Sequence, residues 1–233
     1  MPPFQLPRWS YRLLSDEREA RLYLERAASS PRVAFDIETS QILPFGGRIA
    51  GVSFGFHDQD LGGINCCYIP LYHVASDLVS EDWFHDNVVE FLVNPPGSTN
   101  HNPERVLIAH NAGFEWAWFR HLYGVDLDIG SDTMLVAYVD DGNRSSRDDP
   151  RSVGLKELSK ELYGHDAIRF EDVCGRGKKQ KSITQVPATE VVEYGSQDSW
   201  LSWAIDRTST SRLDAGHPTF SKLSTRCGSA SRP

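Results

Sequence analysis

Three apolar runs within the first 71 residues most constrain the fold of this chain. They are RVAFD (residues 32–36), RIAGVSFGF (48–56) and INCCYIPL (64–71), and the turn-forming segment HDQDLGG separates the last two. Short runs rich in β-branched and aromatic residues between turns are typical of buried strands. We therefore expect an antiparallel three-stranded meander that forms one half of a sheet.

Beyond the meander, the apolar period changes to that of helices. Residues 81–93 place their apolar side chains on one helical face after Ser80, and Pro95 and Pro96 end the pattern. RVLIAHN (105–111) predicts one more short strand, and further helices are expected over 15–28, 113–123, 132–141, 154–164 and 186–205. Strands followed by alternating strands and helices predict an α/β fold, with a mixed central β-sheet flanked by helices.

Composition limits the class of protein. A chain of 233 residues with 39% apolar content can form one domain with a substantial core, and its net charge of -8 argues against nucleic-acid binding through a broad basic surface. The sequence shows neither a long apolar run nor a secretory signal, which predicts a soluble, intracellular (cytoplasmic) protein without a membrane partner. The four cysteines form no CxxC pair, so buried free thiols are expected instead of disulfides or a zinc site.

Asp36 and Glu38 lie two residues apart where the first strand ends, in VAFDIET. The period of a strand turns both carboxylates to one face. Crowded carboxylates repel each other unless a cation lies between them, and hard oxygen ligands favour Mg²⁺ or Mn²⁺ over zinc. A single DxE is also common at a solvated strand end, so this motif is weak by itself.

Two further polar clusters strengthen that interpretation. Glu115 lies in the first turn of a helix in HNAGFEWAWF, and the preceding His110 and Asn111 could bond the carboxylates or a phosphate, although His110 alone is more typical of a structural histidine. Tyr194 and Asp198 lie four apart on a helix and share a face. A phenol beside a metal-binding carboxylate can orient an attacking water. The clusters together predict metal-assisted hydrolysis of nucleic acid.

The order of these segments resembles the DEDD superfamily of 3′-5′ exonucleases, tyrosine subclass, and within it the proofreading exonuclease domain of family A DNA polymerases. The similar segments span residues 31–206 and are FDIET, GVSFGF, YIPLYH, AHNAGFE, SDTMLVAY, GLKELSKELYG and IRFEDVCGRGKKQKSITQV leading to YGSQD. The resemblance implies a ribonuclease H-like fold, two Mg²⁺ or Mn²⁺ ions, and stepwise release of nucleoside monophosphates from the 3′ end of single-stranded DNA.

The resemblance also implies a role for each site residue. Asp36 would bind both metal ions, and Glu38 and Asp198 would complete the tighter of the two sites. Glu38 would also lie near the attacking water, which Tyr194 would position. Glu115 would serve the second ion. Ile42 would be an apolar wedge beside the terminal base and Phe170 a stacking aromatic, although both could equally be core residues. The basic loop 175–181 would meet the backbone of the strand or, alternatively, be merely solvated. The expected nucleic-acid-binding residues are Thr39, Ile42, His110, Asn111, Phe170, Arg176, Lys178, Lys179 and Lys181.

Two departures from the family leave alternatives open. The family has Asp at the position of Glu115, and residues 207–233 form a polar tail, expected to be disordered, that has no family counterpart. Residues 1–30 are expected to be a lead-in with one helix and 31–206 the exonuclease domain, working in proofreading, repair or replication. The chain could be a free-standing, phage-encoded exonuclease that serves a separate DNA polymerase, or a truncated polymerase. An RNA-trimming exonuclease and a catalytically idle module that recruits a polymerase are the rival functions.

Overall fold

A mixed sheet of six strands forms the centre of the molecule, in the order β1-β4-β3-β2-β5-β6. The computed structural model describes residues 4–94, 96–140 and 152–216. The predicted meander is confirmed, because β3 pairs antiparallel with both β2 and β4, while β5 lies parallel to β2, β6 to β5 and β1 to β4. The strands are β1 (Trp9–Leu13), β2 (Arg32–Thr39), β3 (Ile49–Asp58), β4 (Gly63–Pro70), β5 (Val106–Ala109) and β6 (Ser131–Asp132).

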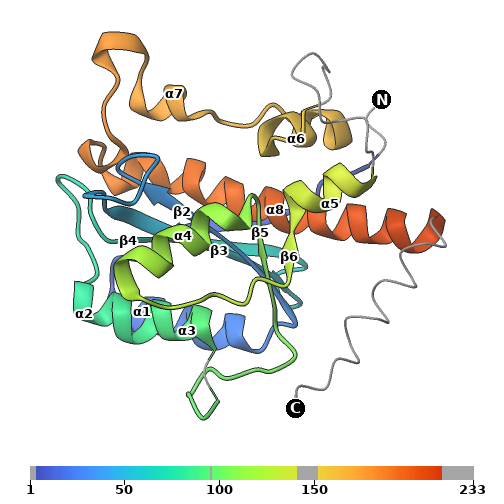
Figure 1. Ribbon diagram of the computed structural model, residues 1–233, viewed down its shortest axis with the longest axis horizontal. Coiled ribbons are helices and arrows are strands. Elements are labelled where there is room, and N and C mark those ends of the chain that lie inside the picture. Colours follow the sequence, from blue (N-terminus) through green and yellow to red (C-terminus); the bar gives the residue numbers. More distant parts are fainter. Residues whose placement is uncertain (1–3, 95, 141–151, 217–233) are drawn as a thin grey trace.

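Helices cover both faces of this sheet, which confirms the α/β class. Figure 1 shows α8 crossing one face, while α1, α2 and α3 lie against the other. A π-helix (Phe84–Val89) interrupts the helix predicted over 81–93. The helices are α1 (Glu17–Ala28), α2 (Glu81–Trp83), α3 (Glu90–Val93), α4 (Ala112–Tyr123), α5 (Thr133–Asp140), α6 (Leu155–Tyr163), α7 (Phe170–Cys174) and α8 (Ala188–Gly216), with 3-10 turns at Gly177–Lys179 and Ile183–Gln185.

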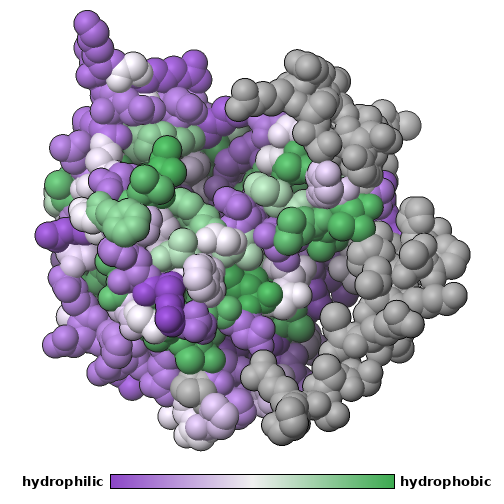
Figure 2. All heavy atoms as spheres, viewed as in Figure 1, coloured by the Kyte–Doolittle hydropathy of each residue, from purple (hydrophilic) through white to green (hydrophobic). Residues whose placement is uncertain are grey.

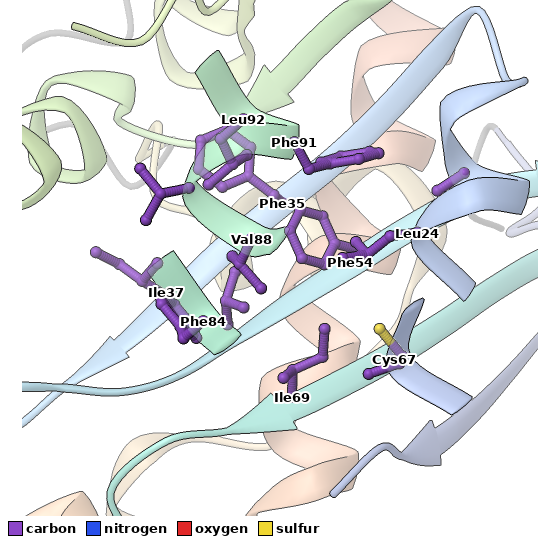
Figure 3. Packing of buried hydrophobic residues seen from close by; sticks show 14 of the residues in the cluster. Leu24, Phe35, Ile37, Phe54, Cys67, Ile69, Phe84, Val88, Phe91 and Leu92 are labelled. Carbon is purple, nitrogen blue, oxygen red and sulfur yellow. The ribbon is translucent and has the colours of Figure 1, made fainter. Parts of the chain in front are cut away.

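The alternation of side chains along β2 divides the core between the two faces. Phe35 and Ile37 pack into the cluster beneath α1 and α3, together with Phe54 of β3 (Figure 3). Ala34 packs on the opposite face, against residues of α8. Because successive side chains of a strand point to opposite faces, Asp36 shares the α8 face with Ala34. The same apolar pattern that builds the core therefore directs the acidic residues toward α8.

The expectation of a disordered tail from residue 207 is wrong for residues 207–216, because α8 continues through Gly216. Asp206 is fully buried and accepts hydrogen bonds from Arg32 Nε (2.9 Å), Arg32 Nη2 (2.8 Å) and the Ser131 hydroxyl (2.6 Å). Thr208 bonds the Tyr163 hydroxyl at 2.8 Å. These partners lie on β2, β6 and α6. Hydrogen bonds to them therefore hold the polar end of α8 in place, although that segment has no apolar stripe of its own. Residues 217–233 lie outside the described part of the chain.

The lead-in expected over residues 1–30 contains a strand as well as a helix. β1 pairs with the edge of β4, and Trp9 stacks on Trp200 of α8 with ring centroids 4.5 Å apart. Three of the five β1 side chains are exposed, so the apolar alternation of a buried strand is missing. An edge strand whose side chains are mostly exposed leaves little trace in the sequence.

Two expectations from composition can be compared with the described residues. Cys66, Cys67 and Cys174 are buried free thiols, as expected, while Cys227 lies outside the described part. Across residues 4–94, 96–140 and 152–216, none of the helices has the length and apolarity needed to span a bilayer. Residues 141–151 of the expected loop 140–152 also lie outside the described part.

Candidate active site

Three carboxylates converge where β2 passes beneath α8. Asp36 and Glu38 come from β2 and Asp198 from α8, and one oxygen from each lies within 4.8 Å of the other two. Glu38 and Asp198 are buried, while Asp36 is half-buried. Two elements far apart in the sequence thus bring together three of the four acidic residues expected to bind metal.

Glu115, the fourth expected ligand, approaches the same place from the first turn of α4. It is only 2% exposed, and its Oε2 has no hydrogen-bond partner. Burial, followed by the charge of Asp36, raises its pKa well above the ordinary value. A buried carboxylate oxygen without a donor is costly, and a cation would satisfy it. Glu115 therefore lies close enough to Asp36 for their charges to interact, although it does not belong to the group of three.

The electrostatics of the cluster fit a divalent cation. Burial raises the pKa values of Asp36 and Glu38 well above normal, and the charge of Asp198 raises both further. Burial also raises the pKa of Asp198, although Lys156 opposes this shift. Because the donors are all carboxylate oxygens, they suit hard cations such as Mg²⁺ or Mn²⁺. These residues therefore fit one or more divalent cations of that kind.

Tyr194 lies one helical turn before Asp198 and is 8% exposed. Burial raises the pKa of its phenol far above the ordinary value, and the charges of Glu38 and Asp198 add to this. The hydroxyl is therefore protonated and available as a hydrogen-bond donor. The predicted arrangement of Tyr194 and Asp198 on one buried face of a helix is present.

The Tyr68 ring fixes how closely α8 approaches the sheet. It lies against Gly51 of β3 and Gly195 of α8, where an added Cβ would come within 2.5 Å and 2.8 Å of the ring, respectively. Its hydroxyl bonds His73 Nε2 at 2.9 Å, and His73 Nδ1 donates to the Val186 carbonyl at 2.8 Å. The two glycines and this hydrogen-bonded chain therefore set the position of the α8 segment that carries Tyr194.

Asp132, which sequence reasoning did not select, holds the start of α4. Its carboxylate accepts hydrogen bonds from the backbone N–H groups of Asn111 and Ala112, both at 3.0 Å, and of Met134 at 2.9 Å. An Asp before a helix is a known N-cap signal, which could have revealed its contact with α5. Its contact with α4 joins segments about twenty residues apart, and no local sequence pattern indicates it. Through that contact, Asp132 positions the turn that carries Glu115.

In the described structure, neither His110 nor the Asn111 side chain forms a hydrogen bond to Asp36, Glu38, Glu115 or Asp198, and a contact with a phosphate stays a prediction. His110 Nδ1 bonds the Thr133 hydroxyl at 2.8 Å, while its buried Nε2 has no partner. Burial lowers the pKa of His110 to about 4, so the ring is neutral near pH 7. Asn111 has a left-handed backbone with φ of 67° and an exposed side chain. Its role in the structure is to begin α4.

The other expected nucleic-acid-binding residues differ in exposure. Ile42 is 81% exposed, which excludes a core role, and the apolar neighbours Leu43 and Phe45 are also exposed. Figure 2 shows apolar residues among polar ones on the viewed surface. The Thr39 hydroxyl donates to the Gln41 carbonyl at 2.8 Å. Phe170 is half-buried and packs against the cluster that contains Tyr194 and Cys174.

The basic residues after α7 are solvent-exposed. Arg176 lies 3.7 Å from Asp172, an exposed pair that contributes little to stability. Lys178 and Lys179 lie in a short 3-10 turn, and Lys181 follows it. Their exposure is compatible with a phosphate contact and equally with a solvated loop.

Lys156 of α6 also contacts the cluster, although sequence reasoning passed over it. Its Nζ donates to Asp198 Oδ1 and lies 4.9 Å from the centroid of the Tyr194 ring. The side chain is only 16% exposed. Its sequence neighbourhood, GLKELSKELYG, is an ordinary amphipathic pattern in which several charged residues look alike. Only the packing of α6 on α8 distinguishes Lys156 from the others.

Comparison with known proteins settles the family. A model for the 3′-5′ exonuclease of DNA polymerase A type matches residues 11–207. The chain belongs to this exonuclease family. The exonuclease is also 26% identical over 211 residues to DNA polymerase I of Pseudomonas aeruginosa, an alignment that covers 88% of this chain and 21% of the polymerase. It therefore spans about a fifth of the length of that relative.

Solved structures share the fold of the exonuclease at lower identity. Escherichia coli RNase D, an exoribonuclease involved in structured RNA processing, matches with a TM-score of 0.60 and 14% identity, over 88% of this chain and 46% of that one. Brucella melitensis NrnC with bound Mg²⁺ matches with a TM-score of 0.53 and 16% identity, over 91% and 83% of the two chains. These matches confirm the predicted ribonuclease H-like fold.

Proposed function

We propose that this exonuclease hydrolyses single-stranded DNA from its 3′ end and releases nucleoside monophosphates. The observation that carries the proposal is the convergence of Asp36, Glu38 and Asp198 to within 4.8 Å between β2 and α8. Three carboxylates this close together in a largely buried place repel one another, and a bound cation offsets that repulsion. The family to which the chain belongs is the reason to assign that site to phosphodiester hydrolysis.

The proposed site residues divide the work by their chemistry. Asp36, Glu38 and Asp198 would hold one ion, and Asp36 with Glu115 would hold a second. Two Mg²⁺ or Mn²⁺ ions, when bound, supply the positive charge that favours hydroxide formation and stabilises the departing 3′ oxygen. The Tyr194 hydroxyl would orient the attacking water by a hydrogen bond. Glu38 would accept a hydrogen bond from the same water.

Exposed side chains beside the carboxylates would hold the end of the strand. Ile42 is free to wedge against the terminal base, and the half-buried Phe170 offers part of its ring for stacking. Base–aromatic stacking tolerates any sequence, which suits an enzyme that shortens arbitrary strands. Thr39, His110 and Asn111 would line the path of the strand. The exposed Arg176, Lys178, Lys179 and Lys181 would follow its phosphates, a local contact compatible with the acidic net charge.

The relatives suggest a setting for this activity. The matched part of DNA polymerase I is about a fifth of that protein, so we propose proofreading or repair beside a polymerase that is separate or joined to it. Gel filtration of the chain mixed with a family A polymerase fragment that lacks its own exonuclease would test the association. If the two proteins elute separately at micromolar concentration, the proposal that the chain associates with a separate polymerase would be refuted.

The substitution of Asp36→Ala with Glu38→Ala tests the hydrolytic proposal. We expect the variant to lose hydrolysis and keep the fold, because it removes two ligands and relieves repulsion. The assay follows stepwise shortening of a 5′-labelled DNA oligomer in Mg²⁺ or Mn²⁺, with chelated metal as a blank. Asp77→Ala, which removes an exposed carboxylate elsewhere, is the matched control and should retain parental activity. Near-parental activity in the double variant would refute the site assignment.

An RNA oligomer of the same sequence completes the assay. We expect faster shortening of DNA, whereas faster shortening of RNA would assign the chain to the RNA-trimming side of the superfamily. Absence of hydrolysis of both strands with either metal, in a folded protein, would favour the idle module that recruits a polymerase.

A further inference from the structure

The Lys156 ammonium occupies a place where a cation is needed. It donates to Asp198 Oδ1, one of the three carboxylates that converge at the site. Its positive charge also lowers the pKa values of Asp36 and Glu38, against the larger effect of burial. The ammonium is therefore close enough to act on all three carboxylates and not only on its direct partner.

The fold holds Lys156 at this place by the packing of α6. Leu155, Leu158 and Leu162 of α6 are buried in the same cluster as Leu201 and Ala204 of α8. The lysine side chain then extends past the Tyr194 ring, with Nζ 4.9 Å from the ring centroid. A cation over an aromatic face is weakly stabilised there. The ammonium can leave this place by rotation of a flexible side chain while α6 stays packed.

We propose that Lys156 is the exchangeable counter-ion of the metal site: it pairs with Asp198 in the metal-free chain and must leave when a divalent cation binds. The inference rests on the metal site of the proposed function and deepens it. A buried carboxylate group is costly without compensating charge, so the lysine stabilises the metal-free protein. The same contact competes with the metal for an Asp198 oxygen. Lys156 thus sets the metal concentration at which the site fills.

Lys156→Met tests the proposal, since it removes the charge and keeps most of the aliphatic length. If the lysine leaves Asp198 in about one molecule in ten, removing it tightens metal binding about tenfold. We therefore expect the variant to bind Mn²⁺ about tenfold more tightly, measured by electron paramagnetic resonance of free Mn²⁺ or by calorimetry. We also expect its metal-free form to unfold at a lower temperature than the parent. Neither measurement depends on hydrolysis.

Lys160→Met is the matched control, because Lys160 lies one turn further along α6 and pairs with the exposed Asp166. It should leave both Mn²⁺ affinity and metal-free melting unchanged. Lys156→Arg keeps the charge and should bind Mn²⁺ nearly as weakly as the parent. These two variants separate the effect of the charge at the cluster from a general effect on α6.

Each outcome distinguishes the inference from the proposed function. One outcome is that the parent binds Mn²⁺, that Asp36→Ala/Glu38→Ala abolishes this binding, and that folded Lys156→Met binds Mn²⁺ no more tightly than the parent. This outcome would overturn the counter-ion role and leave the metal site intact. Failure of the parent itself to bind Mn²⁺ would overturn the proposed function. A lower metal-free melting temperature with unchanged Mn²⁺ affinity would make Lys156 a structural residue and also overturn the inference.

Discussion

Tyr194 contributes a single hydroxyl to the proposed chemistry, and its ring contributes packing. Tyr194→Phe removes the hydroxyl and keeps the ring beside Lys156, in the buried cluster that also contains Tyr68. We expect hydrolysis to slow by about 10²-fold, since an oriented proton-transfer or water-positioning group is typically worth that much. DNA binding, measured by fluorescence anisotropy in Ca²⁺, should stay parental. Equal single-turnover rates for the two proteins would leave Tyr194 with a purely structural role.

Glu115 is the acidic residue that departs from the family pattern, and the structure buries it with one unpartnered oxygen. Its extra methylene displaces the carboxylate relative to Asp. Mg²⁺ tolerates displaced ligands poorly, because it requires near-octahedral geometry at about 2.0–2.1 Å.

We therefore expect the parent to turn over faster with Mn²⁺ than with Mg²⁺, and Glu115→Asp to raise the Mg²⁺-supported rate. Turnover of both proteins across a concentration series of each metal measures this. A rate that falls with both metals in the variant would show that the pocket has adapted to glutamate.

At the scale of elements, α8 connects the site to the sheet through Asp206. This carboxylate is fully buried and bonds both Arg32 of β2 and Ser131 of β6. Removal of one partner of a buried ion pair typically costs about 3–5 kcal/mol, and we expect about 2–3 kcal/mol for Asp206→Ala because Arg32 is 30% exposed and can be hydrated. Urea unfolding measures the loss.

The exposed pair Arg120–Asp126 provides the comparison for Asp206. Both partners are more than half exposed, so Asp126→Ala should cost less than about 1 kcal/mol. Equal losses for the two variants would mean that α8 is not anchored through Asp206. A large loss confined to Asp206→Ala would show that the part of α8 beyond the site stabilises the fold.

At the scale of the whole molecule, the cluster links stability to pH and metal. Burial raises the folded-state pKa values of Asp36, Glu38, Glu115 and Asp198 above their unfolded values. Groups of this kind stabilise the fold fully below their unfolded pKa near 4, and that contribution is lost as pH rises through the folded pKa. The metal-free protein should therefore become less stable as pH rises above the unfolded pKa values near 4.

Melting of the protein in chelator at pH 5.5 and 7.5 measures this loss of stability. A tenfold difference in proton affinity between the folded and unfolded forms of one carboxyl corresponds to about 1.4 kcal/mol. Asp36→Asn/Glu38→Gln is the variant that should flatten the dependence. Saturating Mn²⁺ should raise the melting temperature more at pH 7.5 than at 5.5, because protonated carboxylates bind cations weakly. A parental profile as flat as that of the variant would contradict the coupling.

The residues of the site were predictable where one local pattern fixed their direction. The period of β2 placed Asp36 and Glu38 on one face, and helical spacing placed Tyr194 with Asp198, as the structure shows. That these two segments come together in space was implied by the resemblance to proofreading exonucleases, because no local pattern indicates it. Lys156 and Asp132 were missed because their roles depend on contacts between elements far apart in the sequence.

The sequence by itself determined the α/β class, the antiparallel meander and the faces of the acidic side chains, because apolar periodicity acts over a few residues. Only the tertiary structure decided that β1 joins the sheet edge, that α8 extends through Gly216, and that Glu115 stands beside the group of three carboxylates. Those features depend on long-range partners: Trp200 for Trp9, and Arg32 for Asp206. A polar segment becomes ordered when distant elements satisfy its buried groups, and that condition exists only once the chain has folded.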